Sequence, residues 1–248
     1  PYLDSDKILS TNPRDVQMKR QPTKMIAGSY YQILHSDYTM DKMRKWHKTK
    51  KENIVQSRPS FSTEEAEACY KYMLEDSFIT EFKKTSEMEK MISESLNVKN
   101  CIMTTSGTIA ILLGLMALDL EEGDEIIVPN FTMIATVNSI KMLKLKPVII
   151  DVDKDTLTLN LFEIEKHVNK KTKCVMHVSL NNRYKDLYKI SEFCNSKGIY
   201  FLEDSAQSLG CNVGDKSLGT FGKMGFFSLS TPKIISTGQG GFIVTDDD

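Results

Sequence analysis

Beyond residue 100, short apolar runs rich in β-branched residues alternate with longer segments of helical periodicity. A strand buried on both faces of a sheet is apolar at nearly every position, so the short runs predict strands. The predicted strands cover 125–128, 147–150, 174–178, 199–202, 225–229 and 241–244. The predicted helices cover 108–118, 132–143, 161–168 and 187–196.

This alternation predicts the fold class. Strands joined by a helix of about ten residues run parallel, because the helix carries the chain back across the sheet. The sequence therefore predicts an α/β fold with a mostly parallel central sheet that is covered by helices on both faces. Ligands of such folds bind beyond the carboxyl ends of the strands, so candidate chemistry is expected there.

Two more helices are predicted ahead of these elements. Ser62, followed three residues later by Glu65, is typical of a capping box and predicts a helix from residue 62 to about 75. A second helix is predicted over 86–96. The composition changes near Ser57, and before it the hydrophobic periodicity is weak. We therefore divide the chain into an N-terminal segment, 1–57, and a domain, 58–248.

The composition narrows the class of protein. A chain of 248 residues with 40% hydrophobic and 26% charged residues suits one large globular domain or two modest ones, and excludes a disordered chain. The longest apolar run, 109–118, is well short of the ~20 residues that span a membrane, so no membrane partner is expected. Five cysteines at irregular positions without a CxxC pair indicate a reducing compartment, and we expect a cytoplasmic protein.

The net charge of −1 hides an uneven distribution. Residues 1–60 hold 12 Lys and Arg against six Asp and Glu, and the basic run 42–51 contains the only tryptophan, Trp46. One short basic run is weak evidence for a nucleic-acid patch, so a solvated arm or surface helix is the favoured interpretation. We expect no nucleic-acid partner, and a binding role for this segment stays an alternative.

Gly107 and Thr108 stand where a predicted loop turns into the apolar helix. Backbone N–H groups at the positive end of a helix, together with a hydroxyl, suit an anion such as phosphate. An ordinary N-cap is the structural alternative for this Ser-Gly-Thr sequence.

Asp204 ends an apolar strand, where an ionised carboxylate needs a cationic or N–H partner to offset its desolvation. A protonated ring nitrogen of a ligand is one such partner, and a helix cap for residues 205–209 is the alternative. Gln207, three residues later, lies on the same side of a helical turn and offers both a donor and an acceptor.

Lys233 lies in a predicted irregular loop between Pro232 and the glycine-rich stretch 238–241. Next to a buried strand it could lose hydration and become a nucleophilic amine, whereas the structural alternative is a solvated lysine. Ser228, in the run 226–230, adds a hydroxyl near the same strand end.

A phosphate cradle, a carboxylate for a ring nitrogen and a lysine for a Schiff base are what pyridoxal 5′-phosphate (PLP) requires of a protein. With these residues the sequence resembles the DegT/DnrJ/EryC1/StrS sugar-nucleotide aminotransferases of the PLP-dependent aspartate aminotransferase superfamily (fold type I). The resemblance runs from about Arg58 to Asp248. The segments that carry it are 104–110, 123–140, 146–159, 201–210 and 226–248.

The resemblance implies a role for each candidate. Lys233 is implied to form the Schiff base with the cofactor and to shuttle the proton, and Asp204 to hold the proton of the pyridinium ring. Gln207 is implied to contact the phenolic oxygen. The phosphate site is implied to consist of Ser228, Gly107 and Thr108.

Three positions depart from the family pattern. Met133 stands where an aromatic residue usually stacks on the ring; a thioether can pack on a π-face, and a core methionine is the alternative. Asn182 replaces a glycine in a turn and tolerates the left-handed conformation. Gln239 replaces a common Glu. His177, in a predicted buried strand, is interpreted as a hydrogen-bonded core histidine.

By this resemblance we expect a PLP-dependent aminotransferase that moves an amino group from L-glutamate to a keto-deoxysugar nucleotide and acts as a homodimer. The expected large domain, 58–248, is not followed in this sequence by the family's usual smaller C-terminal domain. One alternative is a relative without transaminase turnover, either an inactive scaffold or a sugar dehydratase. Retention of Lys233 argues against the dehydratase, in which that lysine is replaced.

Overall fold

The computed structural model describes residues 61–75 and 83–248, which belong to two separate compact units. The first contains helix α4 (Thr63–Glu75). Its start confirms the predicted capping box, because the Ser62 N–H donates to Glu65 Oε2 at 2.6 Å and the Glu64 N–H donates to Ser62 Oγ at 3.1 Å. The basic run 42–51, and with it the whole predicted segment 1–57, lies outside the described residues.

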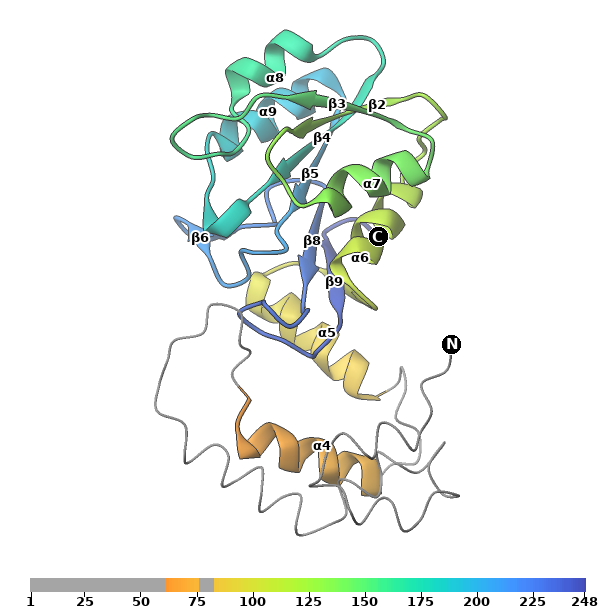
Figure 1. Ribbon diagram of the computed structural model, residues 1–248, viewed down its shortest axis with the longest axis vertical. Helices are drawn as coiled ribbons and strands as arrows, with labels where there is room; N and C mark the ends of the chain where they lie inside the picture. Colours follow the sequence, from red (N-terminus) through yellow and green to blue (C-terminus); the bar gives the residue numbers. More distant parts are fainter. Residues whose placement is uncertain (1–60, 76–82) are drawn as a thin grey trace, which may run out of the picture. The chain divides into compact units, whose positions relative to one another are not determined.

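The second unit, 83–248, is built on a seven-stranded sheet (Figure 1). The strand order is β1-β9-β8-β5-β4-β2-β3, and only β9 runs antiparallel to its neighbours in this sheet. The bounds are β1 Asn100–Thr104, β2 Glu125–Pro129, β3 Lys146–Ile150, β4 Thr172–Val178, β5 Tyr200–Asp204, β8 Met224–Ser228 and β9 Gly241–Thr245. The predicted mostly parallel sheet is confirmed.

Helices cover both faces of the sheet, as predicted. Helices α6 (Gly107–Met116) and α7 (Ile134–Met142) pack on one face, and α5 (Lys83–Leu96), α8 (Leu161–His167) and α9 (Leu187–Lys197) on the other. Successive side chains of a strand point to opposite faces, so Ile126 and Val128 join the α6–α7 core and Ile127 joins the α8–α9 core. This two-sided burial explains why the predicted strands are continuous apolar runs.

The structure adds elements that the periodicity did not predict. Strand β1 pairs only with β9, at the edge of the sheet, and its residues are mostly half-buried, so its sequence lacks a long apolar run. A short antiparallel hairpin, β6 (Asn212–Val213) and β7 (Lys216–Ser217), lies outside the main sheet.

The end of β5 differs from the prediction over 199–202. The strand continues through Asp204, because its pairing with β4 and β8 continues to that residue. The helix considered for 205–209 does not form. Turns take its place, in which the Ser208 N–H donates to Ser205 O at 3.0 Å and the Cys211 N–H to Ser208 O at 3.1 Å.

Candidate active site

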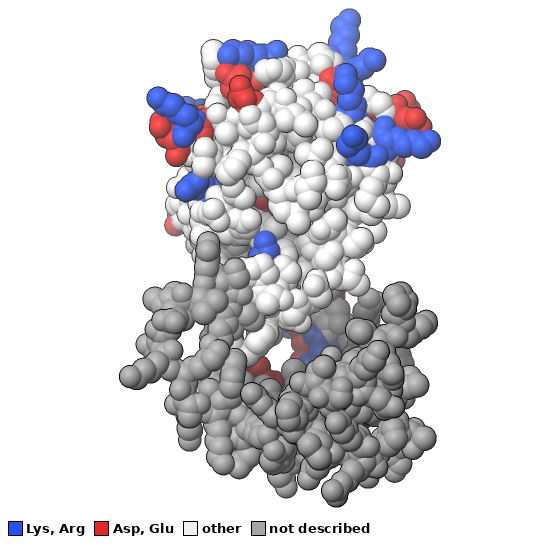
Figure 2. Space-filling view, viewed as in Figure 1, with Lys and Arg blue, Asp and Glu red and all other residues white. Residues whose placement is uncertain are grey.

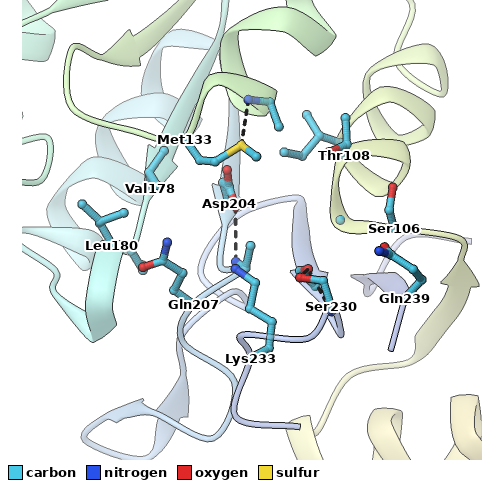
Figure 3. Close-up of a pocket in the computed structure, with 16 residues that line it drawn as sticks. Ser106, Thr108, Met133, Val178, Leu180, Asp204, Gln207, Ser230, Lys233 and Gln239 are labelled. Atoms are coloured by element: carbon cyan, nitrogen blue, oxygen red, sulfur yellow. Dashed lines mark hydrogen bonds between the residues drawn. The ribbon is translucent and has the colours of Figure 1, made fainter. Parts of the chain in front are cut away.

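A pocket opens where β4, β5 and β8 end, at the carboxyl edge of the sheet (Figure 3). This is the edge at which parallel α/β sheets bind ligands. The structure brings all seven predicted site residues together in its lining: Gly107, Thr108, Met133, Asp204, Gln207, Ser228 and Lys233. They come from two helix starts, two strand ends and two loops, and these segments become neighbours only in the folded structure.

One end of the pocket is formed by the start of α6. Ser106 is the N-cap of this helix, and its Oγ accepts the Ile109 N–H at 3.2 Å. Gly107 is buried against β8; a Cβ there would lie 2.8 Å from Ser228 Cβ. The N-cap interpretation is thus confirmed, and the positive end of the helix, with the Thr108 residue, also faces the pocket, which suits an anion.

Hydroxyl groups extend this end of the pocket from β8. The Ser228 hydroxyl donates to Ser230 Oγ at 3.2 Å, and both residues line the pocket. Figure 3 shows Ser230 and Gln239 on the same side as Ser106 and Thr108. This end therefore offers uncharged hydrogen-bond donors around a helix terminus.

Asp204 lies near the middle of the pocket, between Met133 and Lys233, and is 5% exposed (Figure 3). Its Oδ2 accepts the Thr136 hydroxyl at 2.7 Å and its Oδ1 accepts the Ala206 N–H at 3.2 Å. Burial raises the pKa of this carboxyl, whereas the bonds from Thr136 and Ala206 and the charge of Lys233 act in the opposite direction. A carboxylate has about four lone-pair sites, so acceptor capacity is left for a ligand N–H.

Lys233 reaches the pocket from the loop between β8 and β9, where its backbone N–H donates to Ser230 O at 3.0 Å. The side chain is half-buried and extends toward Asp204 in Figure 3. Burial lowers the pKa of the amine, and the charge of Asp204 partly opposes this. Lys233 is thus partly removed from solvent, and the lowered pKa favours the neutral, nucleophilic form of its amine.

Gln207 and Met133 complete the walls. Gln207 Oε1 accepts the Asn181 N–H at 3.0 Å, which turns the amide nitrogen toward the pocket (Figure 3). Met133 is the N-cap of α7, and its Sδ accepts the Ala135 N–H at 3.1 Å. Its side chain is 58% exposed and lies over Asp204, so the interpretation as a core methionine is wrong.

The turn after β4 keeps its left-handed conformation without glycine. Asn181 and Asn182 have φ of 51° and 64°, values that asparagine adopts more readily than most residues. The prediction that this turn survives the replacement of a glycine is confirmed for Asn182. Both residues belong to a short 3₁₀ helix, Leu180–Asn182, beside the pocket.

His177 departs from its prediction. It is fully buried in β4, as expected, but neither ring nitrogen has a hydrogen-bond partner. Burial lowers the pKa of this histidine to about 3. It is a core residue, but not a hydrogen-bonded one.

Thr136, which makes the shortest hydrogen bond to Asp204, was not among the predicted site residues. Its spacing of four residues from Thr132 places both hydroxyls on one face of the predicted helix, which was an available signal. Nothing in the sequence connects that face with a carboxylate 68 residues away.

These groups fit PLP. A helix start with its first glycine pressed against β8 offers a phosphate site, a buried carboxylate keeps free acceptor capacity, and a half-buried lysine faces both. Fold and pocket therefore define a PLP-binding protein of fold type I, and the comparisons with known proteins agree. The chain belongs to the DegT/DnrJ/EryC1/StrS aminotransferase family, whose profile matches residues 59–248.

The chain is also similar to individual proteins of this kind, in sequence and in structure. The chain is 35% identical over 166 residues to GDP-perosamine synthase from Vibrio cholerae, a match that covers 67% of this chain and 45% of the relative. Among solved structures, E. coli GDP-4-keto-6-deoxy-D-mannose-3-dehydratase with bound hydrated PLP matches with a TM-score of 0.75 and 29% identity, covering 79% of this chain and 51% of that one. An aminotransferase from Psychrobacter cryohalolentis matches with a TM-score of 0.74 and 31% identity, over 77% and 49%. The chain thus spans about half the length of these relatives.

No described helix is long and apolar enough to cross a membrane. All five cysteines have free thiols. Cys174 and Cys194 are buried, and burial raises the pKa of the Cys194 thiol to about 12.

Proposed function

We propose that residues 58–248 form the PLP-binding large domain of an aminotransferase that moves an amino group from L-glutamate to a keto-deoxysugar nucleotide. The observation that carries this proposal is that Lys233 and Asp204 face each other in one pocket whose far end is a helix start. The name of one relative, GDP-perosamine synthase, supports a sugar-nucleotide substrate. The name of another, L-glutamine:2-deoxy-scyllo-inosose aminotransferase, supports amino transfer to a cyclic ketone.

PLP, when bound, supplies a carbonyl that captures amino groups and a ring that takes up electrons as a bond to the neighbouring carbon breaks. Lys233 would hold the carbonyl end of the cofactor through Nζ. Because burial lowers its pKa, the same amine can accept a proton when it is released and return it later. One residue thus anchors the cofactor and acts as general base and acid.

The remaining residues would fix the cofactor at its other atoms. Asp204 would accept the ring N–H, and the amide nitrogen of Gln207 would donate to the phenolic oxygen. Ser228, Gly107 and Thr108 would bind the phosphate at the positive end of α6. Met133 would cover one face of the ring with its thioether.

We also propose that the protein works as a homodimer in the cytoplasm. Apolar side chains are exposed beside the pocket, at Phe131 and Ile134 near the start of α7 and at Ile234 and Ile235 next to Lys233. Figure 2 shows charged side chains gathered at the end that carries β3 and α8, while the middle of this face holds few. An uncharged apolar rim is typical of a surface that another subunit covers. Free thiols support a reducing compartment.

The first experiment tests the cofactor site. We expect the purified chain with added PLP to become yellow, L-glutamate to bleach the colour, and Lys233→Ala to stay colourless. Lys189→Ala, an exposed lysine on α9, is the matched control and should behave as wild type. A wild-type protein that stays colourless with PLP contradicts the proposal.

The second experiment tests the reaction. The chain, loaded with PLP, is incubated with L-glutamate and a panel of 3-keto and 4-keto deoxysugar nucleotides, and products are identified by mass spectrometry. Replacement of the keto oxygen by an amino group is the expected result. Loss of water from the sugar would instead indicate a dehydratase, the activity named for one solved relative.

A further inference from the structure

Two threonine hydroxyls and a carboxylate form a continuous row of hydrogen bonds behind the pocket. Thr132 Oγ1 lies 2.9 Å from Thr136 Oγ1, which lies 2.7 Å from Asp204 Oδ2. Thr136 lies in the first turn of α7, and Thr132 lies in the bend just before the N-cap Met133, where the chain brings its hydroxyl back to Thr136. Thr136 faces the end of β5, where Asp204 lies.

The chemistry of the three groups fixes the direction of the protons in this row. An ionised carboxylate can only accept, so the Thr136 hydroxyl donates its single proton to Asp204. Its oxygen then accepts from Thr132, whose hydroxyl lies closer to Thr136 Oγ1, at 2.9 Å, than to its other acceptor, Met133 O, at 3.4 Å. Both hydroxyl protons therefore point toward the carboxylate. Hydrogen bonds in such a chain polarise one another, and each bond becomes stronger.

Asp204 depends on these donors because little of its surface reaches water. The carboxylate is buried, and so is Thr136, which has no exposed surface. The backbone of Ala206 gives a longer bond, at 3.2 Å, and the nearest cation, Lys233, gives no hydrogen bond to it among the described residues. Without Thr136, the charged form would lose the shortest of its hydrogen bonds.

We propose that Thr136, oriented by Thr132, is a positioning residue that keeps Asp204 ionised and in the orientation that accepts a ring N–H. The proposal rests on the proposed function, in which Asp204 holds the ring nitrogen of PLP. It adds a residue that touches no cofactor atom and acts only through the carboxylate.

The first test is a PLP titration, followed by absorbance, of four variants. A hydrogen bond to a charged group is worth enough that Thr136→Val should weaken PLP binding by about 10- to 100-fold. Thr136→Ser keeps the hydroxyl and should stay within about 3-fold of wild type, and Thr132→Val should lose about 3- to 10-fold. Ser191→Ala removes a hydroxyl of α9, which bonds the Phe221 carbonyl away from the pocket lining, and should bind as wild type.

The second test needs no cofactor. The Asp204 carboxyl is titrated by ¹³C NMR in the unloaded protein, where Thr136→Val should raise its pKa by about one unit and Thr136→Ser should not. Wild-type values of both the affinity and this pKa in Thr136→Val overturn the inference. Should Thr136→Val fail to unfold cooperatively, Thr132→Val decides by the same two readings. A wild type that binds no PLP contradicts the proposed function alone, since the NMR titration still tests the row.

Discussion

His177 is a core residue whose two ring nitrogens have no hydrogen-bond partner among the described residues. A neutral imidazole carries one N–H donor and one acceptor, and in β4 both lack a partner. Its only described ring contact is an edge contact with Phe201, at 6.5 Å between ring centres. The register pairs it with Glu203, whose side chain instead accepts the N–H groups of Gly219, Phe221 and Gly222.

We expect His177→Leu to make the protein less sensitive to acid. The pKa of His177 is about 3 in the folded protein and 6.5 when unfolded, so the unfolded chain binds the extra proton between these values. Wild type therefore loses stability as the pH falls below 6.5. Relative to the variant, its free energy of unfolding should fall by about 2 kcal/mol between pH 7.5 and pH 5.

Urea unfolding of both proteins across this pH range measures the difference. Burial raises the pKa of Glu203 to about 7, so this residue lowers the free energy of unfolding as the pH rises. Both proteins contain Glu203, so its contribution drops out of their difference. If the difference in free energy of unfolding between wild type and His177→Leu does not change with pH, His177 is not buried in its neutral form. His167→Leu, on the surface of α8, is the control.

At the scale of elements, the phosphate end of the pocket depends on how closely α6, β8 and β9 approach one another. A Cβ on Gly241, at the start of β9, would lie 2.5 Å from Gly107 N and 2.7 Å from Phe227 O. The Cβ of an alanine at Gly107 would press on β8. Two glycines thus allow three backbones to converge where the helix terminus is exposed to a ligand.

We expect Gly107→Ala to lower the affinity for PLP by more than 10-fold. Alanine is the better helix former by about 1 kcal/mol, so a loss cannot come from helix propensity. It must come from the Cβ, which displaces the helix start from Ser228 and moves the N–H donors. The affinity is measured by absorbance titration, with Leu113→Ala, exposed on the same helix, as control. Unchanged binding would mean that the helix start does not contact the phosphate.

At the scale of the whole molecule, the candidate site is contained in one part of the chain. Its lining residues lie between Ser106 and Gln239, within the unit that holds the sheet. The excess positive charge lies elsewhere, within residues 1–60. The near-neutral chain is therefore the sum of a basic segment and an acidic domain.

A chain beginning at Arg58 should bind PLP within about 3-fold of the full chain, because it keeps every lining residue of the pocket. Comparing the two on a heparin column tests the basic segment at the same time. A salt-dependent loss of retention in the shorter chain would support binding of polyanions by 1–57. Equal retention would remove that hypothesis, and a large loss of PLP affinity would show that the segment contributes to the site.

Much of the fold followed from local pattern. The six predicted strands and the helices α6 to α9 are present, because burial on both faces leaves an apolar run that needs no knowledge of the neighbours. Strand β1 was missed because an edge strand is only half-buried. The apolar run of β5 stops at residue 202, and the burial of Glu203 and Asp204 beyond it depends on partners distant in sequence.

The sequence by itself determined the fold class, the order of the elements and the residues that suit PLP, because each depends on short segments. Tertiary structure decided which groups meet. It placed the Thr136 hydroxyl on Asp204, left His177 without a hydrogen-bond partner, and placed Met133 in the pocket lining rather than in the core. Hydrogen bonds and burial depend on distances between segments far apart in the chain, and these distances exist only once the sheet has formed.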